Sequence, residues 1–199
     1  MNILITVAHP DDETLGMGGT IKKLSKNNEI TLCVMTDGAS AQYDGKKMIK
    51  VRQDACKKAG KILGISKFHF LDFPDMKLDS ISHVEMNKEL EKIIKKINPK
   101  ILYSTSYNDL NKDHQKVFES CSVISRPLSS KIKKFLCFEM GGRNKIPFNP
   151  NTYVDISKEL SFKLKALNQY KTEINPFPHE RSLKFIESLS HVRGVESGF

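Results

Sequence analysis

Apolar runs alternate with amphipathic segments along the first two thirds of the chain. Short apolar runs that predict strands occur at 2–8, 29–36, 67–71, 100–105 and 134–139. Segments with helical spacing of apolar residues occur between them, at 14–27, 46–64, 81–97 and 114–125. Strands that alternate with helices in this way predict a parallel sheet with helices on both sides.

The last third of the chain has a different pattern. Residues 140–152 form a turn-rich stretch, Tyr153-Val154 predicts a short strand, and 157–171 and 179–192 predict two helices. Because no repeat or linker-like composition divides the chain, we expect a single domain over residues 1–199. The predicted fold is an α/β three-layer sandwich of the Rossmann-like type, with a mostly parallel sheet in the strand order 3-2-1-4-5.

The charge of the chain is strongly positive. Lys and Arg number 32 against 23 Asp and Glu, which gives a formal net charge of +9. Much of the excess is lysine on polar helix faces, as at Lys57, Lys58 and Lys61, and this pattern indicates a solvated surface. The positive field can attract an anionic small molecule. No arginine-rich tract or basic-aromatic pattern is present, so we expect no nucleic-acid partner.

Two further features concern where the protein acts. No stretch approaches the roughly 18 consecutive apolar residues of a membrane span, and no signal-like segment precedes the first strand, so we expect a cytoplasmic protein without stable membrane insertion. The four cysteines lie in apolar segments without CxxC spacing and are expected to be reduced core residues. The pattern leaves the formation of a homo-oligomer open.

A polar cluster, His9-Pro10-Asp11-Asp12-Glu13, follows the first predicted strand directly. Closely spaced carboxylates repel one another and are costly to bury, so this cluster makes physical sense around a cation. His9 and Asp12 are three residues apart on a turn and can reach one ion while Asp11 points elsewhere. The alternative is a helix N-cap at Asp11 or Asp12 with Glu13 in the first turn, which leaves His9 unexplained.

A second cluster, Asn108 to His114, follows the predicted strand 100–105. In the predicted strand order the first and fourth strands are neighbours, and their carboxyl ends flank the switch point where ligands bind. His9, Asp12 and His114 would then converge. Two histidines and an aspartate, with water in the fourth position, form an open catalytic zinc site, although the same set also accommodates Fe²⁺.

Helix capping is the competing interpretation of the second cluster. In that case Asp113 would be the N-cap of the following helix and His114 a surface residue. The first cluster and the predicted switch point favour the metal-ligand interpretation.

The two motifs, in this order and at this spacing, resemble those of the PIG-L/LmbE family of zinc-dependent N-deacetylases, which act on N-acetylglucosamine conjugates. The opening AHPDDE motif of that family is present as Ala8–Glu13, and a segment of the NDxNxDH kind matches Asn108–His114. The resemblance extends through Thr36-Asp37-Gly38, Arg52, Leu63-Gly64, Phe73-Pro74-Asp75, Glu139 and Arg193-Gly194, and so covers nearly the whole chain.

The resemblance implies that His9, Asp12 and His114 hold zinc and that Asp11 is the general base. The expected reaction is hydrolysis that removes an N-acetyl or other N-acyl group from a small amino-sugar conjugate. Zinc lowers the pKa of its bound water to about 7, which provides a nucleophile at neutral pH. A carboxylate outside the coordination shell can accept the proton of that water and later return one to the leaving amine.

The chain departs from the family pattern at one site position. Some relatives carry a histidine three residues before the last ligand, where it is thought to stabilise the oxyanion, and this chain has Asn111. Asparagine donates hydrogen bonds but carries no charge. Asp113 could position His114 or only cap the helix. We therefore keep Asn111 and Asp113 as candidate catalytic residues without a fixed role.

Several other residues are candidates for substrate contacts. Asp37 follows the second predicted strand and either faces the site or forms a turn with Gly38. Arg52 could contact an anionic or hydroxylated substrate, or form a surface salt bridge. Arg143 lies in a loop beyond the fifth predicted strand and is a candidate determinant of substrate choice.

The glycine-rich segment 16–19 lies inside a predicted helix and lacks GxGxxG spacing after a strand. It therefore predicts close packing of that helix against the sheet rather than dinucleotide binding.

Three functional hypotheses remain. The leading one is the zinc-dependent N-deacetylase, and the second is a non-catalytic module that binds sugars or nucleotides on the same fold. The third is a nucleic-acid-binding protein driven by the charge of +9. Release of acetate from N-acetylglucosaminides separates the first hypothesis from the second.

Overall fold

All five strands predicted in the first two thirds of the chain form, and they pair in one parallel sheet. The computed structural model describes residues 1–43, 46–142 and 144–199. The strands are β1 (Asn2–Val7), β2 (Glu29–Thr36), β3 (Lys67–Phe73), β4 (Ile101–Ser104) and β5 (Lys134–Cys137). They lie in the order β3-β2-β1-β4-β5, which confirms the predicted topology. In this register Ile3 is opposite Ile30 on β2 and Ile101 on β4.

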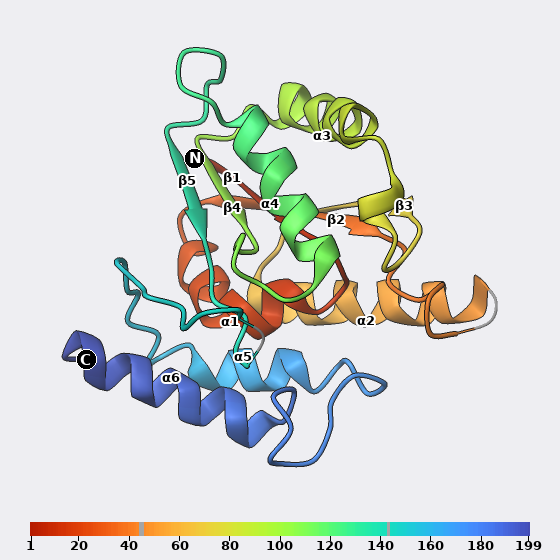
Figure 1. Ribbon diagram of the computed structural model, residues 1–199. Helices are drawn as coiled ribbons and strands as arrows, with labels where there is room; N and C mark the ends of the chain where they lie inside the picture. Colours follow the sequence, from red (N-terminus) through yellow and green to blue (C-terminus); the bar gives the residue numbers. More distant parts are fainter. Residues whose placement is uncertain (44–45, 143) are drawn as a thin grey trace.

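Helices cover both faces of the sheet (Figure 1). The helices are α1 (Asp12–Leu24), α2 (Lys46–Leu63), α3 (His83–Ile97), α4 (Lys112–Ile124), α5 (Leu160–Leu167) and α6 (Leu183–Ser197), with a short 3₁₀ turn η1 (Leu78–Ser80) before α3. Helices α3 and α4 lie on one face, and α1 and α2 lie on the other. Helix α5 packs on α1 and α2, and α6 packs on α5.

Alternation along the strands divides the core into two parts. On β1, Ile3, Ile5 and Val7 point toward α1, α2 and α5, while Leu4 points toward α3 and α4. Successive side chains of a strand lie on opposite faces of the sheet, so a strand covered on both sides must be apolar throughout. The continuous apolar runs of the sequence have this cause.

The last third of the chain differs from the prediction in three details. No strand forms at Tyr153-Val154 within the described residues, and the neighbouring Ile156 packs against Gly19 of α1 instead of pairing with the sheet. Helix α5 is shorter than the predicted 157–171. Helix α6 begins later than predicted because the Ser182 side chain caps it by accepting a hydrogen bond from the Phe185 N–H.

The glycine-rich segment of α1 permits close packing, but with residues outside the strands rather than with the sheet as predicted. A side chain at Gly16 would collide with the ring of Phe138, just beyond β5. The other two contacts are not with the sheet, because Gly18 lies against Lys163 of α5 and Gly19 against Ile156. The glycines therefore let α1 pack closely against the C-terminal third of the chain.

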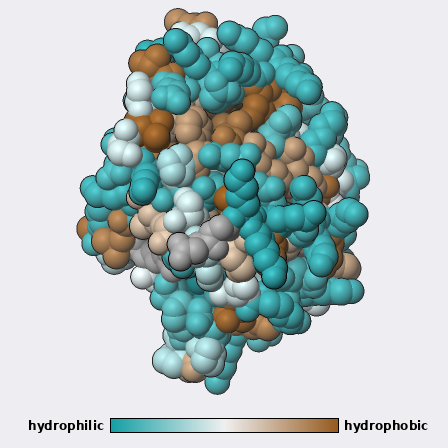
Figure 2. Space-filling model, turned by 90° about the vertical axis from the view of Figure 1, so that its right-hand side faces the viewer, coloured by the Kyte–Doolittle hydropathy of each residue, from teal (hydrophilic) through white to brown (hydrophobic). Residues whose placement is uncertain are grey.

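The surface is largely hydrophilic on the side shown in Figure 2, where apolar side chains gather mainly in the upper half. Within the described residues, none of the helices has both the length and the apolar content that a membrane crossing requires. All four cysteines are free; Cys33, Cys56 and Cys121 are buried and Cys137 is partly buried, in agreement with the prediction.

Candidate metal centre

Three ligand atoms face one another at the switch point between β1 and β4. The His9 Nδ1 lies 3.2 Å from the His114 Nε2 and 3.5 Å from the Asp12 Oδ2, and the last two atoms are 3.3 Å apart. Tetrahedral zinc with bonds of about 2.0–2.1 Å holds neighbouring ligand atoms about 3.3–3.4 Å apart. The three buried side chains therefore fit one tetrahedral ion as they stand.

The other nitrogen of each histidine ring is held by carboxylates. The His114 Nδ1 lies 2.7 Å from an oxygen of Asp109. The His9 Nε2 lies 3.2 Å from Asp113 and 3.1 Å from Asp75. An N–H that donates to these acids leaves the lone pair of the opposite ring nitrogen directed at the common point, as in metal-binding histidines. Two such lone pairs 3.2 Å apart repel each other unless a cation lies between them.

Asp113 also anchors the chain that follows β3. Its two carboxylate oxygens accept hydrogen bonds from the backbone N–H groups of Met76 and Leu78, at 2.8 and 3.0 Å. These bonds fix Asp113 beside His9, although His9, Asp75 and Asp113 form a second group of closely spaced potential ligands. We interpret that group as the hydrogen-bonded support of His9.

The structure changes two interpretations of the second cluster. Asn111, and not Asp113, is the N-cap of α4, because its side chain accepts a hydrogen bond from the Asp113 N–H at 2.8 Å. Asp113 contacts His9, and the acid that contacts His114 is Asp109. His114 is fully buried rather than at the surface, so capping does not account for it.

Asp11 has an unusual backbone conformation. It occupies the N-cap position of α1 with Glu13 in the first turn, as the capping alternative expected, but its side chain makes no capping hydrogen bond. Its φ angle of 145° is rare for a residue with a side chain and costs about 1–3 kcal/mol. The Glu13 carboxylate accepts the Asp11 N–H at 3.2 Å and also accepts the Tyr170 hydroxyl at 2.5 Å. Glu13 thus stabilises the turn that carries Asp11.

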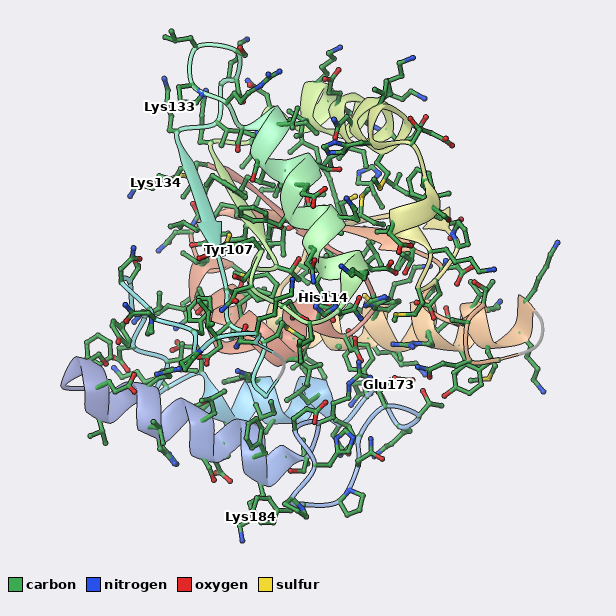
Figure 3. The ribbon with its side chains drawn as sticks, viewed as in Figure 1. Tyr107, His114, Lys133, Lys134, Glu173 and Lys184 are labelled. Carbon is green, nitrogen blue, oxygen red and sulfur yellow. The ribbon has the colours of Figure 1, made fainter. Side chains whose placement is uncertain are left out.

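Two arginines approach the Asp11 side chain from distant segments. Arg181, on the α5–α6 connection (residues 168–182), has its Nη1 3.1 Å from the Asp11 Oδ2. Arg52, on α2, lies 3.5 Å from the same oxygen. Glu173 links both guanidinium groups, at 2.6 Å from Arg181 and 3.4 Å from Arg52. Figure 3 shows Glu173 on this connection, below the start of α4, where His114 lies.

The charges of the cluster shift the pKa values of the three candidate ligands. Burial alone would lower the pKa of His9, but hydrogen bonds with acids, chiefly Asp113 and Asp12, hold that pKa well above its ordinary value. Burial also opposes the charged form of His114, and Asp12 and Asp109 nevertheless raise its pKa to about 8. The histidines hold the pKa of Asp12 well below its ordinary value, against the effect of burial. Protons therefore compete with a metal for this site.

Burial dominates the pKa values of the two acids beside the ligands. Burial raises the pKa of Asp11, and the charges of Arg181 and Arg52 oppose that rise. Burial raises the pKa of Glu13 to about 7, although hydrogen bonds from Thr14 and Tyr170 favour its charged form. Burial of both carboxyl groups thus favours their neutral forms, and a pKa shifted in this way is common among residues of functional sites.

Buried polar atoms without a hydrogen bond concentrate at this site. Among the described residues, eleven buried side-chain nitrogen and oxygen atoms have no hydrogen-bond partner. Five of the eleven belong to Asp11, Asp12, Arg52 and Arg181, namely both oxygens of Asp11, one of Asp12 and the Nε of each arginine. Buried polar atoms in folded proteins nearly always find partners, so this concentration points to a polar ligand.

The three residues predicted to contact substrate, Asp37, Arg52 and Arg143, have different positions in the structure. The Asp37 Oδ1 accepts hydrogen bonds from the Ala39 and Ser40 N–H groups, so Asp37 forms a turn. The surface salt bridge considered for Arg52 is wrong, because this side chain is buried and donates to the Pro10 carbonyl at 3.1 Å. Arg143 lies outside the described residues.

Four residues of the site were not among the sequence-based candidates. Asp109 lies within the second motif, and Asp75 follows β3 directly, so the position of each at the carboxyl edge of the sheet was an available signal. Glu173 and Arg181 lie on an irregular connection, where no periodicity indicates that they approach Asp11.

Comparison with known proteins gives a family model and several deacetylases that resemble this chain. A family model described as PIG-L, GlcNAc-PI de-N-acetylase, matches residues 4–124. The chain is 28% identical to the diacetylchitobiose deacetylase of Thermococcus kodakarensis, over 98% of this chain and 79% of that protein. It is 31% identical to the uncharacterized deacetylase YaiS of Escherichia coli, over 85% of this chain and 90% of that protein.

Two further matches are a relative that aligns with about half of this chain and a solved structure. A probable N-acetyl-alpha-D-glucosaminyl L-malate deacetylase of Bacillus anthracis is 26% identical over 52% of this chain and 49% of that protein. The solved N,N'-diacetylchitobiose deacetylase from Pyrococcus horikoshii superposes with a TM-score of 0.81 at 24% identity, over 99% of this chain and 79% of that one. The last match establishes a shared fold.

Proposed function

The chain belongs to the PIG-L family, and from this premise we propose that it is a metal-dependent hydrolase that removes an N-acyl group from an amino-sugar conjugate. One observation carries the proposal: the ligand atoms of His9, Asp12 and His114 have the mutual spacing of three corners of a zinc tetrahedron. Three protein ligands leave the fourth position open, as in catalytic rather than structural zinc sites.

The three ligands would hold zinc or, as an alternative, Fe²⁺. When bound, the metal would supply a Lewis acid that polarises the acyl carbonyl and makes water more acidic. Asp109 fixes the ring of His114, while Asp113 and Asp75 fix the ring of His9. With both rings held, the lone pairs stay directed at the common point and little reorganisation precedes binding.

Asp11 is the proposed general base. It is adjacent in sequence to a ligand, yet its side chain points toward Arg181 and Arg52 rather than toward the ligand atoms. From there its carboxylate can accept the proton of the attacking water and deliver it to the nitrogen of the leaving amine. The hydrogen bond from its own N–H to Glu13 holds the strained turn that aims this carboxylate.

The substrate class follows from the relatives. The names of three matches, GlcNAc-PI de-N-acetylase, diacetylchitobiose deacetylase and the L-malate deacetylase, each refer to an N-acetylated amino sugar. We infer the same class for this chain, with acetyl as the first acyl group to test. The net charge of +9 favours a conjugate that carries negative charge, whose association would weaken as the salt concentration rises.

The test combines metal content with acetate release. The purified protein is expected to bind one zinc per chain and to release acetate from at least one member of a panel of neutral and anionic N-acetylglucosaminides. Asp11→Asn should retain the metal and lower kcat by about 10²–10⁴-fold, the usual contribution of a general acid-base group. The exposed Asp79 provides a matched control, and Asp79→Asn should change neither quantity.

Two results would contradict this proposal. Equal turnover by Asp11→Asn and the unchanged protein would remove the role of Asp11. Saturable binding of the glucosaminides without acetate release, by protein loaded with metal, would favour the non-catalytic binding module.

A further inference from the structure

Arg181 is one of two arginines of the site that use only part of their hydrogen-bonding capacity. Its Nη1 donates to Glu173 at 2.6 Å and lies 3.1 Å from the Asp11 Oδ2. Its Nε is buried without an acceptor among the described residues. A guanidinium group offers five N–H donors in a planar fork, so most of this fork has no partner within the described part of the chain.

The Arg52 Nε is also buried without an acceptor, but Arg52 is less accessible and is anchored differently. Its side chain is 4% exposed, and its Nη2 donates to the Pro10 carbonyl at 3.1 Å, which ties α2 to the turn that carries Asp11. Arg181 is more exposed, at 14% for its side chain, and it reaches the site from an irregular connection rather than from a helix. Of the two arginines, Arg52 is built into the support of the turn and Arg181 is the one available to a ligand.

The position of Arg181 relative to Asp11 defines what it can contact. A base that takes a proton from the attacking water lies within hydrogen-bond distance of that water, about 2.6–3.2 Å. A donor 3.1 Å from the carboxylate of the base is therefore adjacent to the acyl group under attack. Asn111 cannot serve there as a charged donor, because it is uncharged and its side-chain oxygen caps α4.

We propose that Arg181 is a catalytic residue that donates a hydrogen bond to the acyl oxygen of the substrate; this inference rests on the proposed hydrolysis. As the water oxygen bonds to the acyl carbon, the carbonyl π pair moves onto the acyl oxygen and Asp11 takes the water proton. The Arg181 guanidinium stabilises the negative charge formed on that oxygen. The pair then re-forms the C=O bond, the C–N bond breaks, and Asp11 protonates the departing nitrogen.

The experiment measures kcat, KM and zinc content for Arg181→Ala and Arg181→Lys on the best N-acetylglucosaminide of the panel. Arg181→Ala should lower kcat by about 10²–10³-fold, the usual effect of removing one oxyanion donor, with KM changed by less than about threefold and zinc retained. Arg181→Lys should recover only part of the loss, because an ammonium lacks the planar fork. The exposed Arg126 gives a control for the loss of one positive charge, and Arg126→Ala should behave like the unchanged protein.

Chemical rescue separates a direct contact from a structural one. Guanidinium chloride at tens of millimolar, far below the molar range that unfolds proteins, should raise kcat of Arg181→Ala at least tenfold and leave Arg126→Ala unaffected. Binding of acetate, the acid product, gives a readout independent of turnover, and calorimetry should show it at least tenfold weaker in Arg181→Ala. If Arg181→Ala does not fold, Arg181→Lys becomes the test variant. A tenfold loss of kcat in Arg181→Lys, with zinc still bound, supports the inference.

Different results contradict different claims. A kcat of Arg181→Ala within threefold of that of the unchanged protein, or a loss that follows the loss of zinc, overturns the role of Arg181 and leaves the deacetylase proposal intact. Absence of acetate release from the unchanged, zinc-loaded protein overturns the deacetylase proposal and this inference with it.

Discussion

Charged side chains are buried in two regions of this molecule, and the regions differ in whether these side chains have partners of opposite charge. At the carboxyl edge of the sheet, the buried Asp11, Asp12 and His114 each lie within 4 Å of a group that can carry the opposite charge. Below β4 and β5, Lys163 lines a cavity of about 480 Å³ with only 6% of its surface exposed, and it forms no ion pair among the described residues. The nearby Glu139 is bound to Arg193 by two hydrogen bonds.

The contrast shows what identifies a functional site. Burial shifts pKa values in both regions, since it lowers the pKa of Lys163 to about 8 and raises that of Glu13 to about 7. Only the first region also brings three potential ligand atoms to tetrahedral spacing and holds each of the two histidines by a further acid. Convergent partners therefore mark the site, whereas a shifted pKa alone does not.

The largest expected effect comes from removing a charge from the metal centre. Asp12→Ala should lower zinc affinity by more than about 10³-fold, because even the outer partners of metal ligands contribute about 10–100-fold and Asp12 is itself a proposed ligand. Competition with a chelating dye measures this affinity. Asp79→Ala, which removes an exposed carboxylate, is the matched control. Unchanged affinity in Asp12→Ala would show that the cluster does not hold a metal.

A smaller loss of zinc affinity is expected for Asp109, which contacts the proposed ligand His114. Asp109→Asn keeps the size of the side chain but weakens its hydrogen bond to the His114 Nδ1, so zinc affinity should fall about 10–100-fold while the fold persists. The same dye competition measures it, with circular dichroism as the check on folding. A loss equal to that of Asp12→Ala would mean that Asp109 is itself a ligand.

The second region should respond in the opposite direction. Lys163→Met removes a buried charge without a close partner and keeps a long side chain against Gly18, so the free energy of unfolding at pH 7 should rise by about 1–3 kcal/mol. Denaturant titration measures the change. Lys165→Met, at an exposed position of the same helix, should stay within about 0.5 kcal/mol. A loss of stability in Lys163→Met would indicate that the ammonium has a partner, and the two regions would then be alike.

The pH dependence of this stability sharpens the comparison further. The folded pKa of Lys163 is about 8, below its ordinary value of 10.5, so between these values the unfolded chain binds more protons than the folded one. Unfolding free energy then rises with pH in this window, and the deficit relative to Lys163→Met is full below pH 8 and shrinks toward pH 10.5. Denaturant titrations at pH 7, 9 and 10 measure it. A constant difference would place the pKa of Lys163 at its ordinary value.

The regular part of the fold was predictable from the sequence. Continuous apolar runs indicate strands covered on both sides, and the alternation with helices limits the order of the sheet to a few possibilities. That order brings the ends of β1 and β4 together, so the meeting of His9 with His114 follows from topology alone. The residue types of the two motifs and the strand order therefore predict the same site.

The irregular part could not be predicted in the same way. Whether Asp109 or Asp113 contacts His114 depends on which residue begins α4, and that was fixed by the Asn111 cap. Arg181 reaches Asp11 through a connection without periodicity, so its position depends on how the C-terminal helices pack on α1 and α2. Long-range packing of this kind leaves no trace in local sequence patterns.

The backbone of Asp11 has a further consequence for how this chain can be engineered. A φ of 145° suits glycine, so replacing Asp11 by glycine should give a more heat-resistant protein that lacks the proposed general base. Selection for thermal tolerance alone would therefore favour inactive variants at this position. Screens for hardier forms of the protein need to score turnover alongside melting temperature.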